Sequence, residues 1–236
     1  MGARPVAVRT INELQDALDS TLSWRRVELS ALKGMIEQHE SRSQSLPAGR
    51  SLRRAGIAML YAHWEGFTKE SLQAYVDFLV RRRPKLAELN DGLLQTALLH
   101  ALRRADSGDD AAKQALIDAV RKGGEVRSQL PKAHMVNTQS NLRSAVLMRL
   151  LEDFGLDAAA FELREQLIDR RLCDIRNSIA HGRDACPAIG EFTELHAEVI
   201  GMMEEIRDLV LSAARTGSYK TVSAAANDPA FGSTNQ

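Results

Sequence analysis

Three polar side chains suited to phosphate chemistry are grouped in the stretch DIRNSIAHGRD, residues 174–184. Arg176 can donate paired hydrogen bonds to phosphate oxygens, and His181 can take up or release a proton near neutral pH. On a helix, the long arginine side chain would reach the space beside the imidazole. Asn177 precedes His181 by four residues, so the spacing predicts that its amide orients the ring. A phosphate held beside such a pair would be placed for phosphodiester cleavage.

The same stretch also suits an ordinary helix end. Gly182 follows His181 directly, and glycine is typical of the position just after a helix. A histidine near the last carbonyl groups interacts favourably with the helix dipole. In this interpretation Arg176 is a solvated surface residue, and the spacing alone leaves both interpretations open.

A second group of chemically interesting residues lies in LYAHWEGFTKESLQAYV, residues 60–76. Spacings of three and four place Tyr61, Trp64, Glu65 and Thr68 on one side of a helix. We expect the two aromatic side chains to lie in the core. Glu65 is either a buried acid with its hydrogen bonds satisfied or the carboxylate that orients Arg176, whereas His63 is expected at the surface.

The composition is that of a globular protein rather than a dedicated nucleic-acid binder. The chain has 236 residues, 44% of them hydrophobic and 26% charged, and its formal net charge is zero. Arginine outnumbers lysine by 24 to 7, with runs such as Arg81-Arg82-Arg83. These runs are either phosphate-binding or merely solvated helix faces. The two cysteines suggest reduced thiols in a cytoplasmic protein, and we expect neither a signal peptide nor a membrane span.

Apolar spacing predicts an all-α fold with four or five long helices in a bundle. Thr10 and Glu13 form a capping-box pattern at the start of the first helix, and SLPAG (45–49) is expected to end it. The last helix follows Pro187. The expected helices span residues 10–46, 51–83, 140–154, 157–181 and 189–214, and the predicted apolar face of the fourth includes Leu163.

One domain is expected to occupy residues 1–216. Residues 85–135 read as an insertion between core helices, with short helices at about 93–104 and 111–122 and then an extended connection. Residues 217–236 are small and polar, so we expect a disordered tail.

With both helices in view, the chain resembles the HEPN superfamily. RNSIAHG (176–182) resembles the R-x-x-x-x-H motif of that superfamily, and YAHWEGF (61–67) resembles the helix that accompanies it in a bacterial toxin and defence branch. NLRSAVLMRLLEDFGLD (141–157) resembles the segment before the motif helix. The resemblance covers about residues 50–212.

The resemblance implies a helical bundle and a metal-independent endoribonuclease that needs no cofactor. It implies that Arg176 and His181 are catalytic, with Asn177, Glu65 and Tyr61 in support. Two motifs would meet in the cleft of a homodimer, which suits a reaction that needs both a base and an acid. The expected partners are an RNA substrate, a second copy and an antitoxin protein, and the role is that of a toxin or anti-phage effector. The alternative is a non-catalytic module that binds RNA, a nucleotide or a partner protein.

Overall fold

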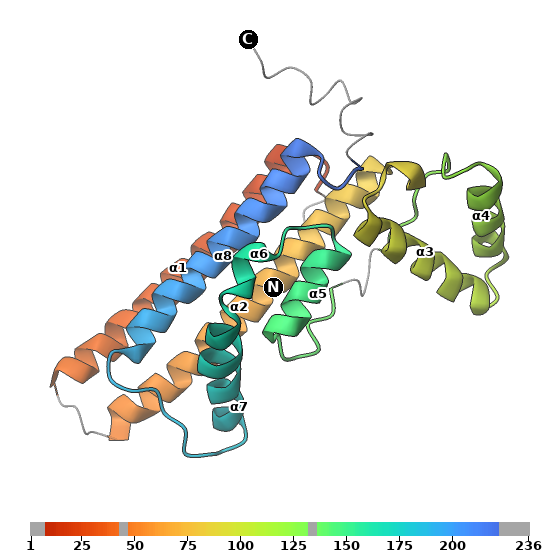
Figure 1. Cartoon of the computed structure of the whole chain (residues 1–236). Coiled ribbons are helices and arrows are strands. Elements are labelled where there is room, and N and C mark those ends of the chain that lie inside the picture. Colours follow the sequence, from red (N-terminus) through yellow and green to blue (C-terminus); the bar gives the residue numbers. More distant parts are fainter. Residues whose placement is uncertain (1–7, 43–46, 132–135, 222–236) are drawn as a thin grey trace, which may run out of the picture.

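The computed structural model describes residues 8–42, 47–131 and 136–221. Its frame is three long helices that each contact the other two: α1 (Ile11–Arg42), α2 (Pro47–Arg82) and α8 (Glu191–Thr216). Figure 1 shows them side by side, with the remaining elements on one flank and at one end of α2. The described part of the chain contains no strand longer than an isolated bridge, which confirms the all-α prediction.

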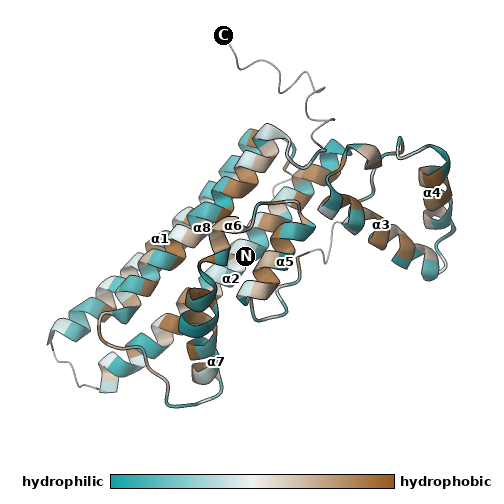
Figure 2. Ribbon diagram, in the orientation of Figure 1, coloured by the Kyte–Doolittle hydropathy of each residue, from teal (hydrophilic) through white to brown (hydrophobic). Residues whose placement is uncertain are grey.

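Helix α2 carries the largest part of the aromatic core. Tyr61, Trp64 and Phe67 are all fully buried, as the spacing predicts for the first two. The Trp64 ring lies 6.3 Å from that of Phe161, which ties the central helix to the chain that leads to the motif. Figure 2 shows hydrophobic and hydrophilic residues interleaved along the long helices, each of which buries only part of its surface.

The start of α1 is confirmed, whereas α2 begins earlier than predicted. The backbone N–H of Glu13 donates to Thr10 Oγ1 over 3.1 Å, and Thr10 N–H donates back to the Glu13 carboxylate over 2.9 Å. Helix α2 starts at Pro47, inside the segment expected to be a break. Proline is compatible with the first turn because no N–H donor is needed there.

The helix predicted from residue 140 begins only at Ser144, as α5 (Ser144–Asp153). Gln139 and Ser140 both have left-handed backbone, with φ of 55° and 54°. Non-glycine residues pay a steric cost in this region, so two in succession form a strained turn held by its surroundings. We call residues 137–141 the site turn.

The helix predicted over 157–181 is divided. Helix α6 (Ala159–Glu162) ends before Leu163, whose side chain is 95% exposed, contrary to its predicted place on the apolar face. After this break the chain forms η2 (Leu167–Asp174), a π-helix, which continues into α7 (Ile175–Ala180). A π-helix has the wider i to i+5 bonding that often marks functional segments.

The insertion forms η1 (Leu86–Glu88), α3 (Asp91–Asp106) and α4 (Asp110–Arg121). Helices α3 and α4 project from the end of α2 (Figure 1). The start of the predicted tail is ordered, because Tyr219 is buried and its carbonyl accepts from Asn90 N–H over 3.0 Å. Residues 222–236 lie outside the described residues. None of the helices in the described ranges has the length and apolar character needed to cross a membrane.

Candidate active site

The guanidinium group of Arg176 is enclosed by groups from three parts of the chain. Its Cζ lies 3.8 Å from the ring centroid of Tyr61, a cation–π contact from α2. Nη1 donates to Asn177 Oδ1 over 2.8 Å, and Nη2 donates to the Ser140 carbonyl over 3.1 Å. The arginine is therefore fixed in place before any ligand binds, which lowers the entropic cost of using it.

Glu65 supplies the negative charge beside this arginine. Its Oε2 lies 3.6 Å from Arg176 Nη2, and the hydroxyl of Thr138 donates to Oε1 over 2.6 Å. The exposed fractions of the two charged side chains are 22% for Arg176 and 18% for Glu65, so solvent screens the pair only partly. The arrangement agrees with the predicted contact between Glu65 and Arg176, although a contact does not establish a catalytic role.

The guanidinium group keeps donors for a ligand. Of its five N–H groups, two make hydrogen bonds and a third faces Glu65. The remaining two have no acceptor among the described residues. A phosphate oxygen that reaches this face would meet N–H groups already aimed by Tyr61 and Ser140.

Tyr61 and Cys173 line the buried side of the site without being suited to proton transfer. The Tyr61 hydroxyl accepts from Leu142 N–H over 2.6 Å, and burial raises the pKa of this phenol. The Cys173 thiol donates to the Leu142 carbonyl over 3.4 Å, and burial raises its pKa to about 12. Both groups stay neutral near pH 7. Tyr61 contacts Arg176 through its ring, and both side chains bind Leu142, the residue after the site turn.

Asn177 has a different role from the predicted one. Its side-chain oxygen accepts from Arg176, and its Nδ2 lies 3.4 Å from Asn141 Oδ1. The link from Asn177 to His181 is through the backbone, where the Asn177 carbonyl accepts from His181 N–H over 3.0 Å. The amide thus orients the arginine rather than the imidazole.

His181 is exposed at the end of α7, as predicted for a helix terminus. Its imidazole makes no hydrogen bond to any described residue. Gly182 then turns the chain with φ of 70°. The segment that follows is anchored on the first turns of α2, where Arg53 Nε donates to Pro187 O over 3.1 Å and Arg54 donates to Arg183 O over 2.8 Å.

Two carboxylates of η2 hold the site turn in place through the start of α5. The N–H and hydroxyl of Ser144 donate to the Asp169 carboxylate over 2.8 and 2.9 Å. Arg143 pairs with Asp174 over 2.5 Å. These contacts fix Ser144 as the first residue of α5. Residues 137–141 therefore stay outside the helix and form the strained turn beside Arg176.

The sequence interpretation missed Thr138, Ser140 and Asn141, which all contact the predicted site residues. The available signal was the composition of NTQSN (137–141), since Asn, Thr and Ser favour turns with local side-chain hydrogen bonds. The prediction for His63 was wrong, because its ring is buried and its Nε2 lies 2.8 Å from Glu28. Within the described ranges, no three His, Cys, Asp or Glu side chains are grouped to hold a metal ion.

Comparison with known proteins adds the family. A family model described as HEPN_MAE_28990-like HEPN matches residues 14–219, from the first turn of α1 to the segment after α8. Comparison with curated proteins gave no match, and comparison with solved structures gave none either. The matched range contains α2, the site turn and the motif helix. The chain therefore belongs to the HEPN_MAE_28990-like family of the HEPN superfamily.

Proposed function

We propose that this protein is a metal-independent endoribonuclease that acts as a homodimer in a toxin or phage-defence role. The observation that carries the proposal is the way Arg176 is held by Tyr61, Glu65 and Ser140 while His181 stands exposed at the end of the same helix. A structural ion pair needs no exposed imidazole on the same helix. A phosphodiester cleavage site needs both a fixed arginine and an imidazole that can exchange protons.

The reaction would use the RNA's own 2′-hydroxyl as nucleophile. One histidine takes the 2′-hydroxyl proton while the 2′-oxygen attacks phosphorus, and the bond from phosphorus to the 5′-oxygen breaks. An acid gives a proton to the departing 5′-oxygen, which leaves a 2′,3′-cyclic phosphate and a 5′-hydroxyl. Arg176 would stabilise the negative charge on the phosphorane oxygens, which is a matter of preorganised electrostatics.

The reaction needs both a base and an acid, and among the described residues His181 is the histidine on the same helix as Arg176. His63 is engaged with Glu28 on α1. A two-fold dimer would bring a second His181 to the same cleft, because a symmetric interface uses the same patch on both copies. The exposed end of α7 is the part of the site available for such a contact.

The test is cleavage of single-stranded RNA by the purified protein in excess EDTA. Wild type is expected to give fragments ending in a 2′,3′-cyclic phosphate, whereas His181→Ala and Arg176→Ala are expected to give none with unchanged helical content. His39→Ala serves as the control for loss of a histidine elsewhere. Cleavage that requires added Mg²⁺ contradicts the mechanism, and no cleavage by wild type would favour a non-catalytic binding module.

A further inference from the structure

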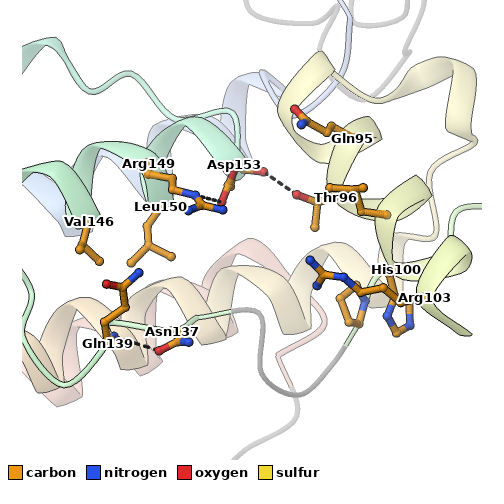
Figure 3. Close-up of a pocket in the computed structure, with 12 residues that line it drawn as sticks. Gln95, Thr96, His100, Arg103, Asn137, Gln139, Val146, Arg149, Leu150 and Asp153 are labelled. Carbon is orange, nitrogen blue, oxygen red and sulfur yellow. Dashed lines mark hydrogen bonds and ion pairs between the residues drawn. The ribbon is translucent and has the colours of Figure 1, made fainter. Parts of the chain in front are cut away.

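A pocket of about 530 Å³ lies between α3 and α5 and borders the active site. Figure 3 shows side chains of α3 facing those of α5, with Asn137 and Gln139 of the site turn closing one side. Gln139 lines the pocket, and the next residue, Ser140, accepts a hydrogen bond from Arg176. Consecutive Cα atoms are about 3.8 Å apart, so the wall of the pocket and the carbonyl that binds Arg176 belong to one stretch of backbone.

The pocket is lined mainly by polar and cationic groups. They are Gln95, His100, Arg103, Asn137, Gln139 and Arg149. One carboxylate, Asp153, also lines it and lies 3.9 Å from Arg149. Arg103 forms no ion pair with a described residue. This lining suits phosphate groups, which arginine binds in pairs of hydrogen bonds, and base edges, which amide side chains bind.

A second hollow, of about 790 Å³, lies near the end of α2 and is more strongly basic. Its charged and titratable lining residues are Arg9, Arg81, Arg82, Arg83, His100 and Arg104. No Asp or Glu is among the described residues that line it. Arg104 is paired with Asp109, but Arg81 and Arg83 have no carboxylate partner among the described residues. Unpaired arginines in a hollow attract polyanions at long range.

The two hollows meet at His100, which lines both. Burial lowers the pKa of His100, and the neighbouring Arg104 and Arg103 lower it further, as expected where positive charge is concentrated. The packing of α3 on α5 fixes the walls. A Cβ at Gly92 would lie 2.1 Å from the Glu152 carbonyl, so only glycine permits the close contact of these two helices.

From this arrangement we infer that both hollows form one basic track that binds the phosphate backbone of single-stranded RNA and leads it to Arg176. The inference rests on the proposed nuclease function and names its substrate path. A single strand fits better than a duplex, because amide groups at the end nearest Arg176 would contact unpaired base edges. It also accounts for a nucleic-acid partner in a chain of zero net charge, since the positive charge is local.

The test measures RNA binding separately from cleavage. All variants carry His181→Ala, and affinity for a fluorescent unstructured RNA is measured by anisotropy over a series of salt concentrations. Arg103→Gln with Arg149→Gln alters the first hollow, and Arg81→Gln with Arg83→Gln alters the second. Each pair is expected to weaken binding by about tenfold and to make the salt slope shallower by about 1.4, since one phosphate contact to a single strand contributes about 0.7.

The matched control is Arg121→Gln with Arg215→Gln, which removes the same charge from exposed positions outside both hollows. Circular dichroism checks that each variant is folded. The track is overturned if both track variants bind RNA as tightly as the His181→Ala parent. It is also overturned if the track and control variants lose equal affinity for RNA. If wild-type protein cleaves RNA while the track variants bind RNA as tightly as the His181→Ala parent, the nuclease function stands without the track. If wild-type protein does not cleave RNA and the His181→Ala parent does not bind it, both proposals fail.

Discussion

Glu65 and Arg176 are 111 residues apart in sequence and lie 3.6 Å apart across the contact between α2 and α7. Thr138 holds the other carboxylate oxygen, so the acid is tied to the site turn as well as to the arginine. The pair therefore couples the central helix, the motif helix and the turn between them. It also partly neutralises the cation that a phosphate would meet.

Replacing this acid should affect activity more than stability. Glu65→Gln keeps the shape of the side chain but removes the charge that aligns Arg176, so we expect the cleavage rate to fall at least about tenfold. The matched control is Glu70→Gln on the same helix, since Glu70 pairs with Arg25 over 3.0 Å and touches no residue of the candidate site. Cleavage rates and thermal midpoints are measured for both. Near-normal cleavage by Glu65→Gln would assign the acid to structure alone.

Mixing two inactive chains tests the composite site. A mixture of Arg176→Ala and His181→Ala chains yields heterodimers with one intact arginine and one intact histidine. Because the reaction is proposed to need two histidines, the mixture should stay inactive. The measurement is RNA cleavage together with molar mass by light scattering. Restored activity would show that one histidine is sufficient, and a fully active monomer would remove the need for a dimer.

We expect the segment after α8 to contribute to the free energy of unfolding as far as Thr221, and the residues beyond it to contribute little. Ending the chain after Thr221 should change the free energy of unfolding by less than about 1 kcal/mol, because residues 222–236 are polar and small. Tyr219→Ala should cost about 3 kcal/mol, since its ring is buried edge-on against Phe78. Denaturant unfolding measures both. Equal effects would mean that the burial of Tyr219 contributes nothing.

Stability should fall as the pH drops below the usual pKa of histidine. Burial lowers the pKa of His63 in the folded protein, and the charge of Arg25 lowers it further, while Glu28 opposes them. The unfolded chain then binds the proton more readily, so the folded state loses stability as the pH falls from about 7 to 5. In His63→Gln this loss should be smaller, as measured by denaturant unfolding across that range. An unchanged loss would place its origin at His100 and His196, whose pKa values burial also lowers.

The sequence predicted the parts of the site that lie on regular helices. Helical periodicity placed Tyr61 and Glu65 on one side of a helix and Arg176 near His181, whereas their choice as a candidate site came from the resemblance to the HEPN superfamily and not from spacing alone. The conformation of the site turn could not be predicted from the sequence. Its conformation depends on Asp169 and Asp174, which cap and anchor a helix 25 and 31 residues away in the chain, and no local pattern reports such a contact. The role of Asn177 was misassigned for the same reason, since its partner Asn141 lies on that turn.

The π-helix of residues 167–174 makes the site sensitive to chain length as well as to residue type. A π segment holds more residues in each turn than an α-helix, so the direction of Arg176 depends on how many residues precede it in that segment. Deleting one residue there would let α-helical bonding resume and would rotate the motif helix by about 100° relative to α2. Arg176 would then turn away from Tyr61, although every residue of the motif would be present. We therefore expect that placing Arg176 beside Tyr61 requires the number of residues between Asp169 and Arg176 to be retained, in addition to the motif itself.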